Sequence, residues 1–197
     1  LSQSYRIPKA IHRVANKISK RISGRHEKIF TSRDEEGSVE YVNYLSEVPL
    51  SSGSFTLMAR TNGYVSEMAN YLRSNGFKFS RNGKSSLSDD MVGNILTWDT
   101  LCQDKSVGVQ QLKALYSGVK KQGKDAVVRR GSTQLLDALS PDDMLDMDTL
   151  IKDYGLQRDA STSAYDALNV ASSERDYIDA IFRRGEDLLS SPRIKVS

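Results

Sequence analysis

The hydrophobic pattern of the chain changes character near residue 86, and this change limits the folds that the chain can adopt. Before that point short apolar runs alternate with one helical run, and we expect strands at 38–42, 55–60 and 76–80 and a helix from Gly63 to Asn75. From residue 86 to residue 190 only helical spacing is found. PRIKVS (192–197) alternates again as a strand does. The pattern therefore predicts an α/β fold in which a sheet with covering helices carries a helical insertion.

The long helical stretch divides at its capping residues and glycines. Ser140, followed by Pro141 and two aspartates, is typical of a helix start, and Gly155 of a helix end. Trp98, Tyr116 and Tyr177 lie among aliphatic residues at helical spacing, so we expect them in the core and not on a base-stacking surface. The expected helices carry their apolar residues over 91–101, 109–119, 135–139, 141–154 and 177–182.

Charge is unevenly distributed although the net charge is only +3. Residues 1–33 hold nine Lys and Arg against Glu27 alone, and they include a predicted amphipathic helix from Pro8 to Ser23. Residues 134–190 hold thirteen Asp and Glu against five Lys and Arg. This pattern is compatible with an anionic partner at the basic end, and equally with two solvated helix faces.

The composition bounds the class of protein. With 197 residues the chain is long enough to bury a core. It has no apolar run of about 18 residues and no apolar region near its first residue, so we expect neither a membrane span nor a signal peptide. Cys102 is the only cysteine, and with His12 and His26 it has no zinc-site spacing. We therefore expect no metal site and a reducing, cytoplasmic setting.

RNGKSS (81–86) follows a predicted strand and precedes a predicted helix, which invites comparison with a phosphate-binding loop. That loop requires G-x-x-x-x-G-K-S/T, and Lys78 occupies the position of the first glycine. Without that glycine the backbone amides do not converge on a phosphate. We predict an ordinary polar loop, and hence no Walker A site in these residues.

Four segments resemble, in order, motifs of the UvrD, Rep and PcrA class of superfamily-one DNA helicases. QSYRIP (3–8), with Ala15-Asn16 in the next helix, is similar to motif IV, roughly Q-N-Y-R-S-T before a helix containing A-N. FTLMARTN (55–62) resembles the family's apolar strand followed by R-S-N or R-T-N. GFKFSRNGKSSL (76–87) resembles G-I/V-P-Y/F-x-I/V-x-G-G-x-x-F/L, which leads into a helical insertion. PRIKVS resembles the strand just before T-I/L-H-x-x-K-G-x-E.

The resemblance implies a division into domains, and the sequence differs from the family's motifs at some positions. Residues 1–85 would belong to the second RecA-like domain with its partly parallel sheet, 86–190 to an inserted all-helical sub-domain, and 191–197 to a strand returning to the RecA-like domain. Ser4 stands where the family has Asn, and Ile7-Pro8 where it has Ser-Thr. The insertion is shorter than in bacterial housekeeping enzymes, as would suit a compact phage helicase. The returning strand suggests that the segment stops inside a domain.

The resemblance also implies roles for individual residues near the first residue. Tyr5 would stack on the adenine of ATP, and Gln3 matches a further position of the nucleotide-binding motif. Arg6 would be the catalytic arginine finger, which stabilises charge in phosphoryl transfer when two RecA-like domains close around ATP. Without the resemblance, Tyr5 would be taken as packed on its own domain and Arg6 as part of a surface salt bridge.

The second set of implied site residues is Arg60, Thr61 and Asn62, which would bind the backbone of single-stranded DNA. A guanidinium, a hydroxyl and the free amides of a helix start suit a phosphate. Ordinary helix capping by Thr61 or Asn62 is the competing interpretation, and it is compatible with DNA contact. Arg81, Lys84 and the basic run from Lys9 to Arg25 are weaker candidates for phosphate attraction.

The expected function is therefore part of an ATP-dependent DNA helicase and translocase that moves 3′ to 5′ on single-stranded DNA. ATP and Mg²⁺ would be held mainly by a first RecA-like domain outside these residues, so we expect the 197 residues alone to hydrolyse no ATP. Two alternatives remain open at this point. One is a non-catalytic DNA-binding or protein-interaction module that reuses the helicase fold. The other is a recombination nuclease arm, which would need a carboxylate-rich metal site.

Overall fold

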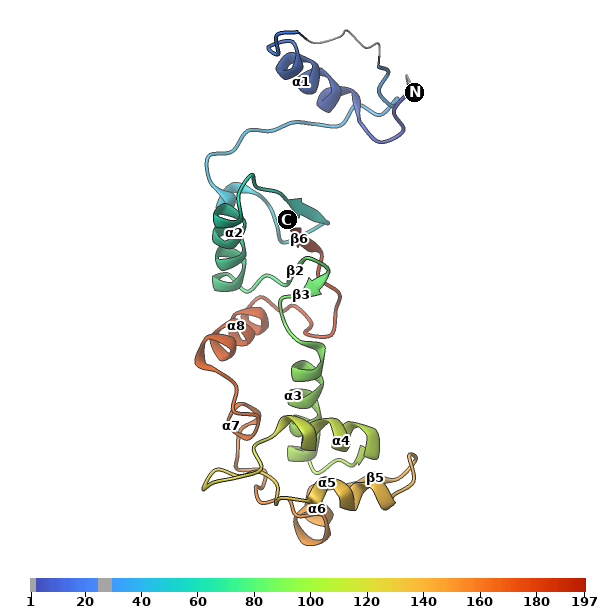
Figure 1. The fold of residues 1–197 in the computed structure, drawn as a ribbon, viewed down its shortest axis with the longest axis vertical. Helices are drawn as coiled ribbons and strands as arrows, with labels where there is room; N and C mark the ends of the chain where they lie inside the picture. Colours follow the sequence, from blue (N-terminus) through green and yellow to red (C-terminus); the bar gives the residue numbers. More distant parts are fainter. Residues whose placement is uncertain (1–2, 25–29) are drawn as a thin grey trace. The chain divides into compact units, whose positions relative to one another are not determined.

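The computed structural model describes residues 3–24 and 30–197 (Figure 1). The chain divides into two compact units, residues 1–49 and residues 50–197. The boundaries expected at 85/86 and 190/191 both lie inside the second unit. Of the residues named above, Arg25, His26 and Glu27 lie outside the described ranges.

The first unit is built around helix α1 (Lys9–Ser19), which ends one turn before the predicted Ser23. The first amides of a helix have no acceptor within it, and here a returning segment supplies two. Lys9 N–H donates to Glu35 O (3.0 Å) and Ala10 N–H to Glu36 O (2.9 Å). Gly37 follows with φ +66°, and a Cβ there would lie 2.7 Å from Pro8 Cβ, so only glycine fits this close approach.

The strand predicted at 38–42 is wrong, because these residues have no regular structure. Their apolar side chains alternate, but Val39, Tyr41 and Val42 are all exposed, and Tyr41 is 86% exposed. Alternation yields a strand only where a neighbouring strand and a core receive it. The only other regular element of the described first unit is the short 3₁₀ helix η1 (Leu45–Glu47).

The second unit contains a four-stranded sheet in the order β1–β6–β2–β3. Strand β6 (Ile194–Val196) lies between β1 (Phe55–Leu57) and β2 (Phe79–Arg81) and is parallel to both. Strand β3 (Lys84–Ser85) pairs antiparallel with β2. The predictions of strands at 55–60, 76–80 and in PRIKVS are confirmed, although each strand is shorter. The chain is thus α/β with a small mixed sheet.

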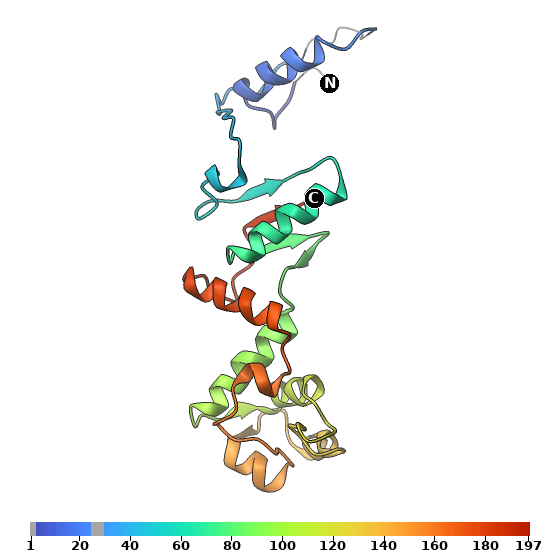
Figure 2. The ribbon, with the colours of Figure 1, turned by 90° about the vertical axis from the view of Figure 1, so that its left-hand side faces the viewer.

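Helix α2 (Asn62–Ser74) lies against this sheet (Figures 1 and 2). It buries Val65, Ala69 and Leu72, while the central strand buries Ile194 and Val196. Because side chains alternate along a strand, Lys195 belongs to the other face, where it lies in register with Thr56 and Ser80. One face of the sheet is therefore apolar and the other polar.

Residues 88–190 form the helical part of the second unit. Its first helix, α3, follows the β2–β3 hairpin in the chain (Figure 1). Ser88 caps α3, because its Oγ accepts the Met91 N–H (3.5 Å). Gly155 ends α6 with φ +71°, as predicted. The helices are α3 (Asp89–Cys102), α4 (Val109–Gly118), α5 (Ser132–Leu135), η2 (Leu136–Ala138), α6 (Met147–Asp153), α7 (Ala164–Ala167) and α8 (Ser172–Arg183).

Two predictions for the helical part are wrong. Strands β4 (Val107–Gly108) and β5 (Met144–Leu145) form a small antiparallel ribbon, so helices do not fill the whole stretch. Helix α6 begins at Met147 and not at Pro141. The Asp143 carboxylate accepts the Ser140 N–H (2.8 Å) and closes a turn, whereas Asp146 accepts the Thr149 N–H (2.9 Å) and caps the helix. Ser140 and Asp146 are both residue types that cap helices, but Met144 and Leu145 between them pair with β4, so the helix begins only after Asp146.

The three aromatic residues predicted for the core are buried, and each polar tip has a partner. Trp98 Nε1 donates to Thr162 O (2.8 Å), and the Tyr116 hydroxyl donates to Tyr154 O (3.2 Å). The Tyr177 hydroxyl donates to Phe77 O (2.8 Å). Burial raises the pKa of Tyr177 to about 12, so it stays a neutral donor. Within the described residues, no helix has the length and apolarity needed to cross a membrane.

Candidate functional site

The candidate site lies at the carboxyl edge of the sheet, where the three parallel strands end together. Leu57, Val196 and Arg81 are in register at these ends. The ladder continues one step further, because Ser197 N–H donates to Leu57 O and Ala59 N–H to Ser197 O (both 3.0 Å). In sheets of parallel strands, ligands bind outside the carboxyl ends. This edge is therefore the place to look for a binding site in the second unit.

Arg60, Thr61 and Asn62 connect the carboxyl end of β1 to the start of α2, and all three are exposed. Thr61 is the N-cap, and its Oγ1 accepts the Tyr64 N–H (3.4 Å). The capping interpretation is thus confirmed for Thr61. In the described residues the side chains of Arg60 and Asn62 have no hydrogen bond or ion pair. A free guanidinium and a free amide accordingly lie beside the positive end of a thirteen-residue helix.

Strand β2 adds a second cation to the same edge. The Arg81 Nη1 donates to the Ser66 hydroxyl (3.4 Å), and that hydroxyl donates to Asn62 O (2.9 Å). Arg81 thus reaches across from β2 to the first turns of α2. Lys84, which lies opposite Arg81 in β3, is exposed and belongs to the same face of the hairpin.

RNGKSS forms the tight turn of this hairpin, and it is not the simple polar loop that we predicted. Asn82 and Gly83 both have positive φ, at 52° and 77°, as a two-residue hairpin turn requires. The turn projects Arg81 and Lys84 at the carboxyl edge. The Asn-Gly dipeptide is the sequence signal that could have identified this hairpin.

The carboxyl edge is therefore an exposed cationic surface that combines the first turn of a helix with three basic side chains, Arg60, Arg81 and Lys84. Among the described residues none of these three has a carboxylate within 4 Å. Tyr64, in the first turn of α2, is also exposed and adds an aromatic face. Such a surface attracts phosphates and offers one ring for stacking on a base.

The motif at the start of the chain lies in the first unit, on a turn held by Ser4. The Ser4 Oγ accepts the backbone N–H groups of Arg6 (3.3 Å) and Ile7 (3.2 Å). Ser4 N–H in turn donates to Thr31 O (2.8 Å). Serine and asparagine side chains both accept such hydrogen bonds from the backbone, so an asparagine at position 4 would support the same turn.

This turn leaves its two functional candidates pointing outward. Tyr5 is 82% exposed, and Arg6 is exposed with no side-chain hydrogen bond or ion pair among the described residues. Gln3 is different, because its Nε2 donates to Ser32 O (3.1 Å) and its backbone bridges to Thr31. Tyr5 and Arg6 are thus available to a ligand, whereas Gln3 anchors the turn.

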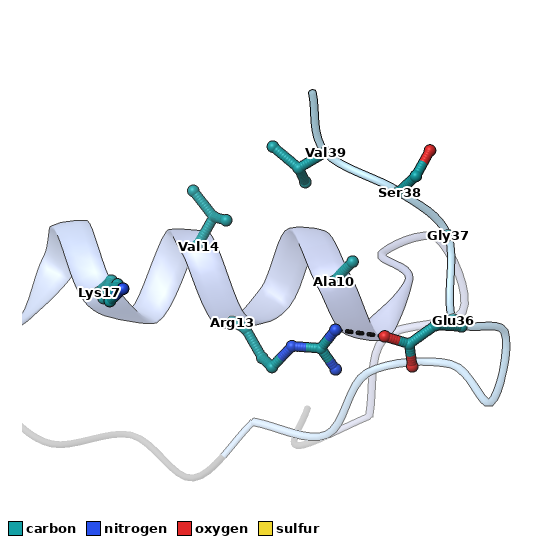
Figure 3. Close-up of a pocket in the computed structure, with 8 residues that line it drawn as sticks. All are labelled: Ala10, Arg13, Val14, Lys17, Glu36, Gly37, Ser38 and Val39. Carbon is teal, nitrogen blue, oxygen red and sulfur yellow. Dashed lines mark hydrogen bonds and ion pairs between the residues drawn. The ribbon is translucent and has the colours of Figure 1, made fainter. Parts of the chain in front are cut away.

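A groove of about 530 Å³ also lies in the first unit, between α1 and residues 36–39 (Figure 3). Arg13 extends toward Glu36 and forms an ion pair with it, while Val14 and Val39 line the apolar side. The hydrogen bond from Arg13 lowers the pKa of the Glu36 carboxyl. Gln3, Tyr5 and Arg6 do not line this groove. It is a feature of the packing of α1, and the candidate residues lie elsewhere.

Comparison with known proteins identifies no family for this chain. No family model, no curated protein and no solved structure matches the chain. The two sets of candidate residues therefore rest on the motifs and on the local structure alone. Within the described residues, no three His, Cys, Asp or Glu side chains are grouped so as to hold a metal ion.

The structure also shows a buried charged residue, Lys78, for which the sequence pattern indicated no role of its own. Lys78 is only 5% exposed, and its Nζ donates to the carbonyls of Asp187 (3.1 Å), Leu188 (2.5 Å) and Ser190. Burial lowers the pKa of the Lys78 ammonium. This lysine ties the connection between α8 and β6 to the start of β2, so its role is to hold the returning strand and not to bind a ligand.

Proposed function

We propose that the chain is part of an ATP-dependent DNA helicase of the UvrD, Rep and PcrA class and contributes single-stranded DNA contacts at the carboxyl edge. One observation carries the proposal. The R-T-N segment, which the resemblance assigns to DNA, lies at the carboxyl ends of parallel strands, beside a helix start and next to two further cations. A surface of this kind binds the phosphate backbone without reading sequence.

Tyr5 and Arg6 supply the second part of the proposal. In the complete enzyme, Tyr5 would stack on the adenine of ATP and Arg6 would approach its γ-phosphate. Both side chains are exposed and without partners in the described residues, so they can meet a nucleotide held by another domain. The first RecA-like domain would hold the ATP and Mg²⁺ that phosphoryl transfer requires. The chain's own part is to complete the site when the two domains close.

The proposed DNA surface is tested by measuring the binding of a labelled single-stranded oligonucleotide by fluorescence anisotropy. Arg60→Ala removes an exposed cation that has no partner in the described residues, so the fold should persist. Loss of one phosphate contact should weaken binding about fivefold at about 0.1 M salt and reduce the salt slope by about 0.7. Wild-type affinity in Arg60→Ala would count against DNA binding at this edge.

Arg183→Ala is the matched control, because Arg183 is an exposed arginine of the same unit at the end of α8, where the neighbouring Arg184 contacts Ser51 and Phe77, which precede β1 and β2. It makes one hydrogen bond, from Nε to Asp179 O (3.3 Å), and we expect its removal to leave the affinity unchanged. A decrease of equal size in both variants would indicate general charge attraction and not a located site.

A non-catalytic DNA-binding module is the second candidate function. Three parallel strands with one short antiparallel strand make up the sheet in the described residues, which is small for a domain that works in a motor. The two candidates differ in their dependence on nucleotide. Mixing the chain with a domain that carries a Walker A site, and adding ATP, should change DNA affinity only if the helicase proposal holds.

A further inference from the structure

The helical part of the second unit contains a loop with an unusual concentration of positive charge. Residues 119–131, here called the basic loop, connect α4 to α5. Within it lie five Lys and Arg against a single Asp, namely Lys120, Lys121, Lys124, Arg129 and Arg130 against Asp125. This contrasts with the acidic character of residues 134–190 that follow.

The basic loop is held in a fixed conformation. Val127 and Val128 are buried, and Val128 pairs with Leu156 in an isolated antiparallel bridge. Two backbone hydrogen bonds flank this bridge, from Arg129 N–H to Gly155 O and from Gln157 N–H to Val127 O, both 2.8 Å. The cations are thus displayed on an anchored frame, so binding would cost little backbone ordering.

The charge of the basic loop is largely unneutralised. Lys120 has Asp125 within 3.4 Å, but the other four cations have no carboxylate within 4 Å among the described residues. Elsewhere in the helical part, Lys113 is paired with Asp137 (2.9 Å) and Arg175 with Asp166 (2.9 Å). An unpaired cluster of cations attracts a polyanion from solution.

A hollow of about 320 Å³ lies where the basic loop meets residues 158–175. Arg158 enters it with its Nη2 bound to Lys124 O (2.9 Å), and it has no carboxylate partner in the described part of the chain. Thr162 and Asn169 add neutral polar groups. The two carboxylates that line it, Asp125 and Asp166, are each paired with a cation that also lines it, which leaves the Arg158 charge in excess.

The side chains exposed on the basic loop favour a nucleic acid over a protein as the partner. The three valines of the loop are buried, so the exposed surface is made of charged and polar groups and glycine. Protein interfaces depend on apolar and aromatic anchors at their centre. A phosphodiester backbone requires only positive charge and hydrogen-bond donors.

We propose that the basic loop and Arg158 form a second nucleic-acid surface, which contacts the phosphodiester backbone at a place separate from the carboxyl edge. The choice of nucleic acid as partner rests in part on the proposed function, but the surface itself does not involve Arg60, Thr61 or Asn62. Its contacts are electrostatic, so affinity falls steeply with salt and is indifferent to base sequence.

The test compares two triple variants of the full chain by fluorescence anisotropy with single-stranded and double-stranded oligonucleotides. Lys121→Gln/Lys124→Gln/Arg130→Gln removes three charges from the basic loop. Lys105→Gln/Lys152→Gln/Arg183→Gln removes the same residue types from exposed positions elsewhere in the helical part. We expect the first variant to bind at least about tenfold more weakly than the second at about 0.1 M salt, with a salt slope reduced by about 2.

The outcomes separate this inference from the proposed function. Equal affinity of the two triple variants on both oligonucleotides would overturn the second surface, even if Arg60→Ala weakens binding. A defect in the loop variant with none in Arg60→Ala would support the second surface and contradict the carboxyl edge. A defect on only one oligonucleotide supports the inference and identifies the form of nucleic acid.

A second measurement keeps the inference testable if the loop variant fails to fold. Lysine methylation of the wild-type chain, followed by mass spectrometry, reports which ammonium groups a bound oligonucleotide covers. Lys121 and Lys124 should be protected several-fold more than Lys105 and Lys152. Equal modification of all four lysines, with and without DNA, would contradict the proposal.

Discussion

At the scale of single residues, Gly76 shows how the helical part is joined to the sheet. It has φ +68°, and a Cβ there would lie 2.3 Å from Ala180 O and 2.4 Å from Ala180 C in α8. Arg184, from the end of the same helix, lies over the Phe77 ring at 3.6 Å. Helix α8 therefore packs directly on the backbone between α2 and β2, and a side chain at position 76 would push it away.

Gly76→Ala should destabilise the second unit by about 2–5 kcal/mol, the sum of left-handed strain and overpacking. Gly83→Ala is the matched control, because Gly83 has φ +77° but nothing within 4 Å of its missing Cβ. It should cost only the strain, about 1–2 kcal/mol. Urea unfolding followed by circular dichroism measures both. Equal losses in the two variants would show that contact with α8 contributes nothing.

At the scale of elements, the start of α6 depends on one carboxylate. Asp146 accepts the Thr149 N–H, and its hydrogen bonds with Thr149 lower the pKa of Asp146 below its ordinary value of 3.8. A carboxyl whose pKa is lower in the folded state stabilises the fold above its unfolded value, and loses this effect as pH falls through the folded value. The cap should therefore be pH-dependent in the acid range only.

Asp146→Ala should lower the thermal midpoint at neutral pH, and the difference from wild type should shrink as the pH falls below about 4. Asp146→Asn keeps an acceptor that does not titrate, so its difference from Asp146→Ala should stay constant with pH. Ser140→Ala should leave the thermal midpoint nearly unchanged if Asp146 is the cap. Thermal melts at neutral and acid pH test all three variants. A larger loss in Ser140→Ala would support the helix start first predicted from the sequence.

The elements that could be predicted from the sequence are those whose local signals agree with their surroundings. Thr61, Ser88 and Gly155 mark helix ends because their side chains or backbone angles satisfy groups within a few residues. Residues 38–42 show the opposite case, since a strand depends on a partner that the pattern does not specify. The same holds for the β4–β5 ribbon, whose strands are two residues long and distant in sequence.

The candidate sites likewise differ in how much of each could be predicted from the sequence. The R-T-N segment could be placed at a strand-to-helix junction from its pattern alone. The approach of Arg81 to Ser66 depends on β6 being inserted between β1 and β2, and a sequence pattern does not give that order. The basic loop escaped notice because its charges adjoin an acidic region, and only the structure shows which of them are paired.

At the scale of the whole molecule, the two units differ sharply in how much apolar surface they bury. Ala10 is the only buried apolar residue within the described part of the first unit. Ile11 and Ile18 of α1 are exposed, as is Ile22 beyond the helix, although their spacing predicts a helix with an apolar face. The second unit has a continuous core that includes Trp98, Tyr116 and Ile178. Helices gain most of their stability from packing of this kind.

Hydrogen exchange should therefore distinguish the units in the isolated chain. Amides of α1 should exchange within seconds, with protection factors far below those of α3, α4 and α8, because α1 can open without exposing a core. Mass spectrometry of pepsin fragments, after labelling at neutral pH, measures this. Protection of α1 equal to that of α3 would mean that its isoleucines are covered in solution. If the helicase proposal holds, the presence of the remaining domain should raise the protection of α1 and leave α3 unchanged.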